Sequence, residues 1–229
     1  MTDTQPPPIA TLNILAVLSQ KGGAGKTTLS CALAALAERA GITTIVYDLD
    51  PQASAMRWHD LREASTGNEK PLVFCVPPSR VDKLLNDHGN AGAELVIIDT
   101  PPHSGADALT VAQLARHILV PVQPSLPDLS AITSTLQIAR TAQRPATVIL
   151  NRARVNHRSI DEARAILTGS HATIAPVVMH HRIAHSTSYI TGQCAAETEP
   201  TGKAAAELNE LFDWLRTSGS IPRADGRAA

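Results

Sequence analysis

Residues 21–28 form the segment that most constrains how this chain can fold. They read Lys21-Gly22-Gly23-Ala24-Gly25-Lys26-Thr27-Thr28. The apolar residues 13–18 before this segment predict a β-strand, and residues 26–40 after it predict an α-helix. The glycines let the backbone turn tightly between the two, because glycine adopts conformations that other residues avoid. A strand, a glycine turn and a helix in this order predict an α/β fold.

The rest of the chain continues this alternation of short apolar runs and longer amphipathic runs. Further strands are expected at residues 43–48, 72–76, 94–99, 117–122, 146–150 and 174–178. Further helices are expected at residues 52–65, 79–88, 106–115, 128–143, 159–167 and 202–216. Runs such as Leu95-Val96-Ile97-Ile98 lack polar alternation, so these strands should be buried on both faces. We therefore expect a doubly wound, mostly parallel sheet flanked by helices.

The length of 229 residues favours one domain, which we place at residues 11–217. Residues 1–10 include three consecutive prolines, and residues 218–229 are small, polar and interrupted by glycine and proline. Both ends are expected to be disordered tails. No apolar run reaches the roughly 18 residues of a membrane span, and the three cysteines lack zinc-ligand spacing. These features predict a soluble cytoplasmic protein.

The glycine turn has the composition of a phosphate-binding loop. Backbone N–H groups at a strand-to-helix turn, together with the helix dipole, can cradle phosphate oxygens. In such a loop Lys26 reaches the β- and γ-phosphates of a nucleotide, and Thr27 binds Mg²⁺. Nucleotide contacts are expected along the whole segment, from Lys21, Gly22, Gly23, Ala24, Gly25, Lys26, Thr27 and Thr28.

Acidic residues follow two of the predicted strands. Asp48 and Asp50 lie in the segment Asp48-Leu49-Asp50-Pro51-Gln52, and Asp99 ends the strand at residues 94–99. The carboxyl ends of parallel strands meet at one edge of a sheet, where ligands of α/β folds bind. An aspartate in the position of Asp99 is expected to hold Mg²⁺, commonly through water. Asp50 can also be read as a helix N-cap, with Pro51 at the first helical position.

One departure from the ordinary phosphate loop points to a family. The ordinary pattern G-x4-G-K-[ST] requires glycine where this chain has Gln20, and Lys21 adds a lysine inside the loop. The pattern K-G-G-x-G-K-T-T resembles the loop of the deviant-P-loop (deviant Walker) ATPases, which include the ParA partition proteins and MinD. The D-x-D-P-Q segment and Pro121-Val122-Gln123-Pro124-Ser125 extend this resemblance over most of residues 12–216. Small, single-domain (ParF-like) ParA proteins are the most similar type.

This resemblance implies an ATPase that binds ATP and Mg²⁺ and forms ADP and phosphate. Lys21 would contact the phosphates of the other subunit in an ATP-dependent homodimer. Asp50 would position or activate the attacking water, so the catalytic residues expected are Lys21, Lys26 and Asp50. Mg²⁺ would be held by Thr27 and Asp99, with support from Asp48.

Two further positions follow from the same resemblance. Asn151 and Arg152 fall where relatives contact adenine, although a surface turn explains this pair equally well. Ala53 stands where ParA proteins often have glycine after D-x-D-P-Q, which leaves the conformation of that loop open.

A surface for nonspecific DNA rests on basic residues in the second half of the chain. The whole chain has 20 basic and 21 acidic residues, so no global field predicts nucleic-acid binding. A local cluster comprises Arg140, Arg144, Arg152, Arg154, Arg158 and Arg164. Such a cluster can bind phosphates independently of sequence, and a solvated face is the alternative reading. Arg182 resembles a DNA-contacting arginine of ParA relatives, so the contacts expected are Arg154, Arg158, Arg182, Lys203 and Arg216.

The family resemblance implies a nucleoid-associated protein that partitions plasmid or chromosomal DNA. A ParB-like centromere-binding or adaptor protein would be its partner and would stimulate its ATPase. The alternative is a ParA-like ATPase that positions a protein cargo, such as a carboxysome or chemotaxis cluster, on the nucleoid. A MinD-like membrane-cycling ATPase is a third reading, but core packing explains the apolar stripe at residues 202–216 better than membrane binding does.

Overall fold

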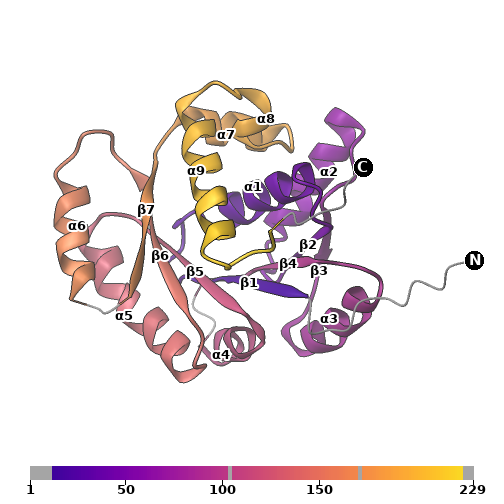
Figure 1. Cartoon of the computed structure of the whole chain (residues 1–229), viewed down its shortest axis with the longest axis horizontal. Coiled ribbons are helices and arrows are strands. Elements are labelled where there is room, and N and C mark those ends of the chain that lie inside the picture. The colour runs from indigo at the N-terminus through magenta and orange to yellow at the C-terminus, as the bar shows by residue number, and fades with distance from the viewer. Residues whose placement is uncertain (1–11, 103–104, 170–171, 224–229) are drawn as a thin grey trace, which may run out of the picture.

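A computed structural model describes residues 12–102, 105–169 and 172–223 of the chain. Within this part, seven strands form one parallel sheet in the order β3-β2-β4-β1-β5-β6-β7 (Figure 1). The strands are β1 (Asn13–Val17), β2 (Thr44–Asp48), β3 (Leu72–Cys75), β4 (Leu95–Asp99), β5 (His117–Val122), β6 (Ala146–Ala153) and β7 (Thr173–His180). Strands β2 and β4 are buried throughout, which their continuous apolar sequences predict.

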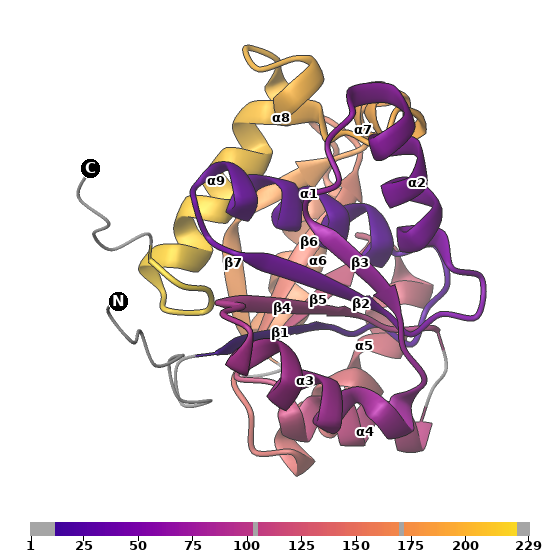
Figure 2. The same ribbon diagram turned by 90° about the vertical axis from the view of Figure 1, so that its right-hand side faces the viewer.

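Helices cover both faces of this sheet (Figures 1 and 2). One face carries α1 (Lys26–Arg39), α2 (Ser54–Thr66), α7 (Ile183–Ile190), α8 (Ala195–Thr198) and α9 (Lys203–Thr217). The other carries the short 3-10 helix η2 (Pro78–Arg80), α3 (Val81–Asn90), α4 (Gly105–Leu114), α5 (Leu126–Thr141) and α6 (Ser159–Thr168). The parallel pairing and the two helical layers confirm the predicted doubly wound fold.

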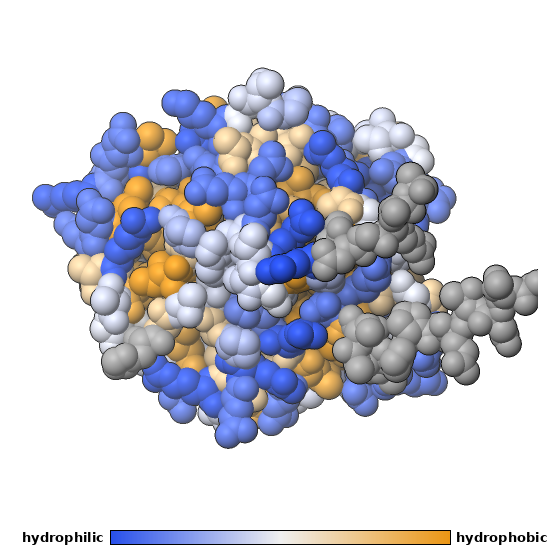
Figure 3. All heavy atoms as spheres, in the orientation of Figure 1, coloured by the Kyte–Doolittle hydropathy of each residue, from blue (hydrophilic) through white to orange (hydrophobic). Residues whose placement is uncertain are grey.

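The surface reflects the position of each strand in the sheet. In Figure 3, hydrophilic side chains cover much of the face, and apolar side chains gather on its left, in the region of β7 and α6. In the edge strand β7, one face is buried in the core through Ala175, Val177 and Met179, and the alternating residues of the other face are exposed or half-buried. None of the described helices is long and apolar enough to cross a lipid bilayer.

The structure differs from the sequence-based expectation in two regions. Helices α7 and α8 were not expected, because their sequences are short and rich in Ser, Thr and Ala without a clear apolar period. At the carboxyl end, Ser220 and Ile221 are each only 2 % exposed, and Ile221 belongs to the core beside α9. The boundary predicted at residue 217 is therefore too early. The predicted tail at residues 1–10 and residues 224–229 lie outside the described residues.

The pairing of the central strands brings three chain segments into one row. Val17 at the end of β1 pairs with Asp99 of β4, and Asp99 pairs with Asp48 of β2. Because all three strands run in the same direction, the loop after β1 and both acidic segments leave the sheet at its carboxyl edge. The fold therefore assembles the predicted site from segments about 80 residues apart in the sequence.

Candidate nucleotide-binding site

The glycine-rich loop between β1 and α1 is held from the side of β5 and β6. The carbonyl oxygen of Gly23 accepts hydrogen bonds from Gln123 Nε2 and Arg152 Nη1, both at 2.9 Å. The carbonyl oxygen of Ala24 accepts one from Asn151 Nδ2 at 2.7 Å. These side chains bond to carbonyl oxygens of the loop. An anion-binding turn uses its backbone N–H groups for the ligand, so these bonds do not compete with an anion.

Lys26 lies inside this loop with only 7 % of its surface exposed. Its Nζ donates to the carbonyl oxygens of Ser19 at 3.3 Å and Lys21 at 3.5 Å. Burial lowers the pKa of the Lys26 ammonium group, and the carboxylates of Asp99 and Asp50 oppose this change. Both hydrogen bonds are long, so phosphate oxygens can replace these acceptors at little cost.

The two deviant positions of the loop have different environments. Gln20 accepts a hydrogen bond from Ser134 Oγ of α5 at 2.9 Å, which links the loop to that helix. Lys21 is exposed at the rim of the loop, and its predicted contact with a second subunit stays a prediction.

Asp99 is fully buried, with 0 % of its surface exposed. Ser30 Oγ donates to its Oδ1 at 3.3 Å, whereas Oδ2 has no hydrogen-bond partner among the described residues. Burial raises the pKa of this carboxyl to about 7, against hydrogen bonds from Thr27 and Ser30. A buried carboxyl oxygen without a partner is costly, and a bound cation removes that cost. Asp99 and the adjacent Thr27 hydroxyl therefore fit the predicted Mg²⁺ site.

Both carboxylate oxygens of Asp48 accept hydrogen bonds from the backbone. Its Oδ2 accepts from the N–H groups of Ala55 at 2.8 Å and Met56 at 3.2 Å, in the first turn of α2. Its Oδ1 accepts from the N–H of Asp50 at 3.1 Å. Asp48 therefore caps α2 from outside the helix, and its supporting role in the magnesium shell stays a prediction.

Asp50 is half-buried and lies in a turn before α2. Its Oδ1 accepts a hydrogen bond from the N–H of Gln52 at 2.9 Å. The helix begins at Ser54, so the alternative reading of Asp50 as an N-cap with Pro51 at the first helical position is also wrong. Ala53 at the cap position has φ 50°, a left-handed conformation that glycine adopts more easily, as the glycine of relatives suggests.

A pocket of about 380 Å³ adjoins the loop on the side of β7. Its walls come from the loop and α1, the end of β6, and the unexpected helix α7, and include Gly25, Thr28, Asn151, Arg152, His185 and Tyr189. The amide of Asn151 is engaged at both ends, because its Oδ1 accepts from the N–H of Arg152 at 3.0 Å. Asn151 and Arg152 thus line the pocket and brace the loop, while their contact with adenine stays a prediction.

Arg182 lies at this pocket and not on a free basic surface. Its Nε and Nη2 donate to Glu207 Oε1 of α9 at 2.9 and 2.5 Å. The same carboxylate accepts from His180 Nδ1 at 2.8 Å and from its backbone N–H at 3.0 Å. These contacts lower the pKa of Glu207 despite its burial. The sequence offered no signal for this pairing, because Glu207 lies 25 residues away on another element.

Among the other predicted DNA contacts, Arg154 follows Ala153, which pairs with His180 of β7, and Lys203 lies one helical turn before Glu207. Arg154 and Arg158 are exposed beyond the end of β6, where Arg158 makes a solvent-exposed 3.4 Å contact with Glu162. Lys203 begins α9 and Arg216 lies in its last turn, so about 20 Å of helix separates them. Arg216 is paired with Asp213 at 3.8 Å. Arg216 thus lies at the far end of α9 from Lys203, and the DNA contacts stay a prediction.

We predict that Gly25→Ala destabilises the protein by roughly 2 kcal/mol and weakens nucleotide binding. Gly25 has φ +86°, and a Cβ there would lie 2.4 Å from Asn151 Nδ2. The substitution combines left-handed strain with loss of the bond to Ala24. Gly22→Ala is the matched control, because its Cβ would meet nothing within 4 Å. Urea unfolding of both variants measures the difference, and equal stabilities would contradict the prediction.

Comparisons with known proteins agree with this geometry. Residues 15–193 match the model of the CobQ/CobB/MinD/ParA nucleotide binding domain. Maintenance of carboxysome distribution protein A of Halothiobacillus neapolitanus is 26 % identical over 208 residues, which cover 87 % of this chain and 94 % of that protein. Its counterpart in Gloeobacter kilaueensis is 34 % identical over 66 % of this chain and 67 % of that protein. The chromosome-partitioning ATPase Soj of Thermus thermophilus is 29 % identical over 59 % of this chain and 66 % of that protein.

Solved structures share the fold at low sequence identity. Apo McdA of Cyanothece superposes with a TM-score of 0.74 at 16 % identity, over 89 % of this chain and 98 % of that one. The cell division ATPase MinD of Pyrococcus furiosus superposes with a TM-score of 0.72 at 17 % identity, over 90 % of this chain and 99 % of that one. With the family model spanning most of the sheet and the phosphate loop, the chain belongs to the ParA/MinD family of deviant-P-loop, nucleotide-binding ATPase domains.

Proposed function

We propose that this chain binds Mg-ATP, dimerises with it and hydrolyses it slowly, using the cycle to distribute a cargo over nonspecific DNA. The observation that carries the proposal is the row at the carboxyl edge of the sheet, where Asp99 and Asp48 are paired in register beside the phosphate loop. Membership of the ParA/MinD family supports it, as does the Asp99 oxygen that has no partner in the described part of the chain.

Each residue of the proposed site has one task in the reaction. Phosphoryl transfer depends mainly on positioning and charge neutralisation. The Lys26 ammonium group binds the β- and γ-phosphate oxygens, and Thr27 and Asp99 hold Mg²⁺, which neutralises charge on the phosphates when bound. Asp50 positions or activates the attacking water. Lys21, exposed at the rim, reaches the phosphates of a second copy and makes dimerisation depend on nucleotide.

Two cargoes are consistent with the family. Partition of plasmid or chromosomal DNA with a ParB-like partner agrees with the similarity to Soj and to the chromosome partitioning protein ParA of Myxococcus xanthus. Positioning of a protein assembly is supported by the match to a carboxysome distribution protein over 94 % of its length. The longer match favours a protein cargo on the nucleoid, and centromere partition is the second candidate.

We predict that Asp50→Ala lowers the hydrolysis rate by about 100-fold or more, while ATP-dependent dimers persist. Asp50 accepts only a local turn bond from Gln52, so its loss leaves the fold intact. Asp48→Ala is the matched variant, since it removes the cap of α2 and lowers the free energy of unfolding by about 1–2 kcal/mol. Phosphate release, light scattering with ATP and urea unfolding distinguish the two. Unchanged hydrolysis in Asp50→Ala would exclude the proposed role.

DNA binding is expected to need ATP and the exposed arginines after β6. The double variant Arg154→Ala with Arg158→Ala should weaken binding to random-sequence duplex about ten-fold, and it should lower the salt slope by about 2 per protomer. Arg80→Ala is the control, because it removes an exposed arginine that follows β3 at the opposite edge of the sheet. Fluorescence anisotropy at several salt concentrations gives both quantities. DNA affinity that is the same with and without ATP would contradict the proposed cycle.

The two cargoes differ in what fails when the gene is deleted. Loss of a protein-positioning ATPase should cluster or misplace a cytoplasmic assembly while DNA inheritance stays normal. Loss of a partition ATPase should instead raise the frequency of cells that lack the plasmid or chromosome. Time-lapse microscopy of labelled DNA and labelled assemblies in the deletion strain makes the distinction.

A further inference from the structure

Helix α7 lies between the pocket and α2, and one side chain touches both. Tyr189 lines the pocket, and its hydroxyl donates to the carbonyl oxygen of Ser54 at 2.8 Å. Ser54 is the first residue of α2 and comes four residues after Asp50. The pocket wall is therefore bonded directly to the start of the helix that follows the Asp50 turn.

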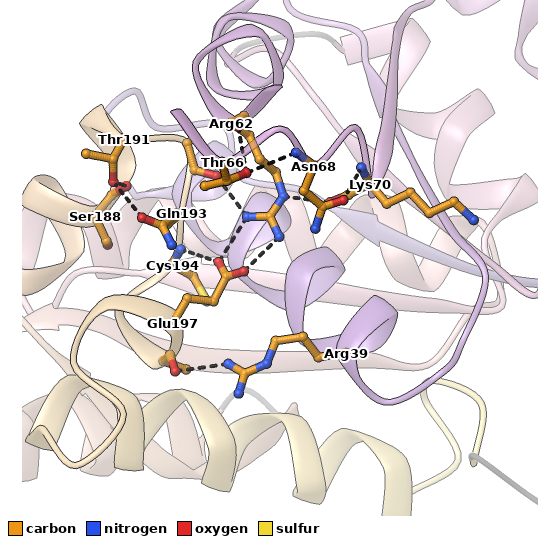
Figure 4. A network of polar contacts seen from close by, with 12 residues as sticks. Arg39, Arg62, Thr66, Asn68, Lys70, Ser188, Thr191, Gln193, Cys194 and Glu197 are labelled. Carbon is orange, nitrogen blue, oxygen red and sulfur yellow. Dashed lines mark hydrogen bonds and ion pairs between the residues drawn. The ribbon is translucent and has the colours of Figure 1, made fainter. Parts of the chain in front are cut away.

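Further along α2, Arg62 binds both the turn after α7 and the next helix, α8, where it forms a buried ion pair (Figure 4). The Arg62 side chain is 3 % exposed and contacts Glu197 at 2.7 Å. It also donates to the carbonyl oxygens of Gly192 at 3.0 Å and Lys70 at 2.6 Å. Gly192 has φ +64°, and a Cβ on it would lie 2.0 Å from the backbone nitrogen of Arg62. The turn after α7 is thus packed against the backbone of α2 without space for a side chain.

Two more hydrogen bonds extend this contact along the helix. Trp58 Nε1 donates to the carbonyl oxygen of Gln193 at 3.3 Å, and Ser65 Oγ donates to that of Thr191 at 2.6 Å. The contacts run from the first turn of α2 to its last. Since movement of α7 together with the turn after it would break several of these contacts, α7, this turn and α2 are expected to move as one body.

The start of α2 is in turn bonded to the Asp50 turn. Asp48 accepts from the N–H groups of Ala55 and Met56 and also from the N–H of Asp50. A shift of α7 therefore reaches Asp50 through Tyr189, the first turn of α2 and the Asp48 carboxylate. Each step in this path is a hydrogen bond between adjacent groups.

We propose that Tyr189 is a positioning residue, which couples occupancy of the pocket to the placement of Asp50 for hydrolysis. The inference rests on the proposed function, because it assumes that the nucleoside part of ATP occupies this pocket and that Asp50 acts on water. A nucleotide in the pocket contacts α7, and the bond from Tyr189 to Ser54 carries this contact to α2. The rate of hydrolysis then depends on contacts with the nucleoside part of ATP as well as on contacts with its phosphates.

The test is Tyr189→Phe, which keeps the ring in the pocket and removes the bond to Ser54. We expect affinity for a fluorescent ATP analogue and KM to stay within about two-fold, while kcat falls roughly ten-fold. Thr187→Val is the matched control on the same helix, because its hydroxyl bonds only within α7, to the carbonyl oxygens of Ile183 and Ala184. That variant should behave as the unmodified protein.

Hydrogen exchange gives a second readout that needs no hydrolysis. In the unmodified protein, ADP with Mg²⁺ should slow exchange at the Ala55 and Met56 amides, which Asp48 caps. In Tyr189→Phe this protection should be lost, although ADP still binds. Unchanged kcat and unchanged protection in the variant would overturn the coupling. Failure of the unmodified protein to hydrolyse ATP would overturn the proposed function instead, and failure to bind nucleotide would overturn both.

Discussion

The register of the three central strands is the constraint on which the rest of the structure depends. Val17, Asp99 and Asp48 are neighbours only because β1, β4 and β2 are parallel and paired without a shift. A slip of one residue would turn each side chain to the opposite face of the sheet. The aliphatic residues of these strands are buried on both faces, so the cost of such a slip is the loss of two hydrophobic cores.

The three aspartates at or beside this row have different hydrogen-bond partners, which suit them to different tasks. Asp99 keeps one buried oxygen without a partner among the described residues and is suited to a cation. Asp48 uses its carboxylate to cap α2. Asp50 is bound only by a local turn and stays half-buried. The physical difference is the number of backbone N–H groups that each carboxylate accepts, because every accepted bond removes a lone pair from the ligand.

The site also shows how distant elements complete a local motif. The phosphate loop owes its shape to side chains after β5 and near the end of β6, which bind the carbonyl oxygens of Gly23 and Ala24. The pocket beside it owes one wall to α7. Arg62 of α2 bonds to Gly192 in the turn after α7 and forms a buried ion pair with Glu197 of α8. Such a pair gives little net stability, yet it strongly disfavours arrangements that leave either charge unpaired.

The sequence by itself determined the fold class, the order of strands and helices along the chain, and the place of the phosphate loop. Local patterns suffice for these features: continuous aliphatic runs require burial, and only a glycine-rich turn lets backbone N–H groups surround an anion. The position of Asp99 was equally readable, because a polar residue that ends an apolar strand must lie at the edge of the sheet.

Only the tertiary structure decided the other features. Helices α7 and α8 lack a strong period of their own, and packing on α2 stabilises them. Arg182 faces Glu207, and Asn151 braces the loop. The cap of α2 comes from Asp48, six residues before the helix begins. Each of these features depends on contacts between side chains or backbone groups of different helices and strands. Such residues are distant in the sequence, and no local sequence pattern predicts a hydrogen bond that forms only when the chain folds.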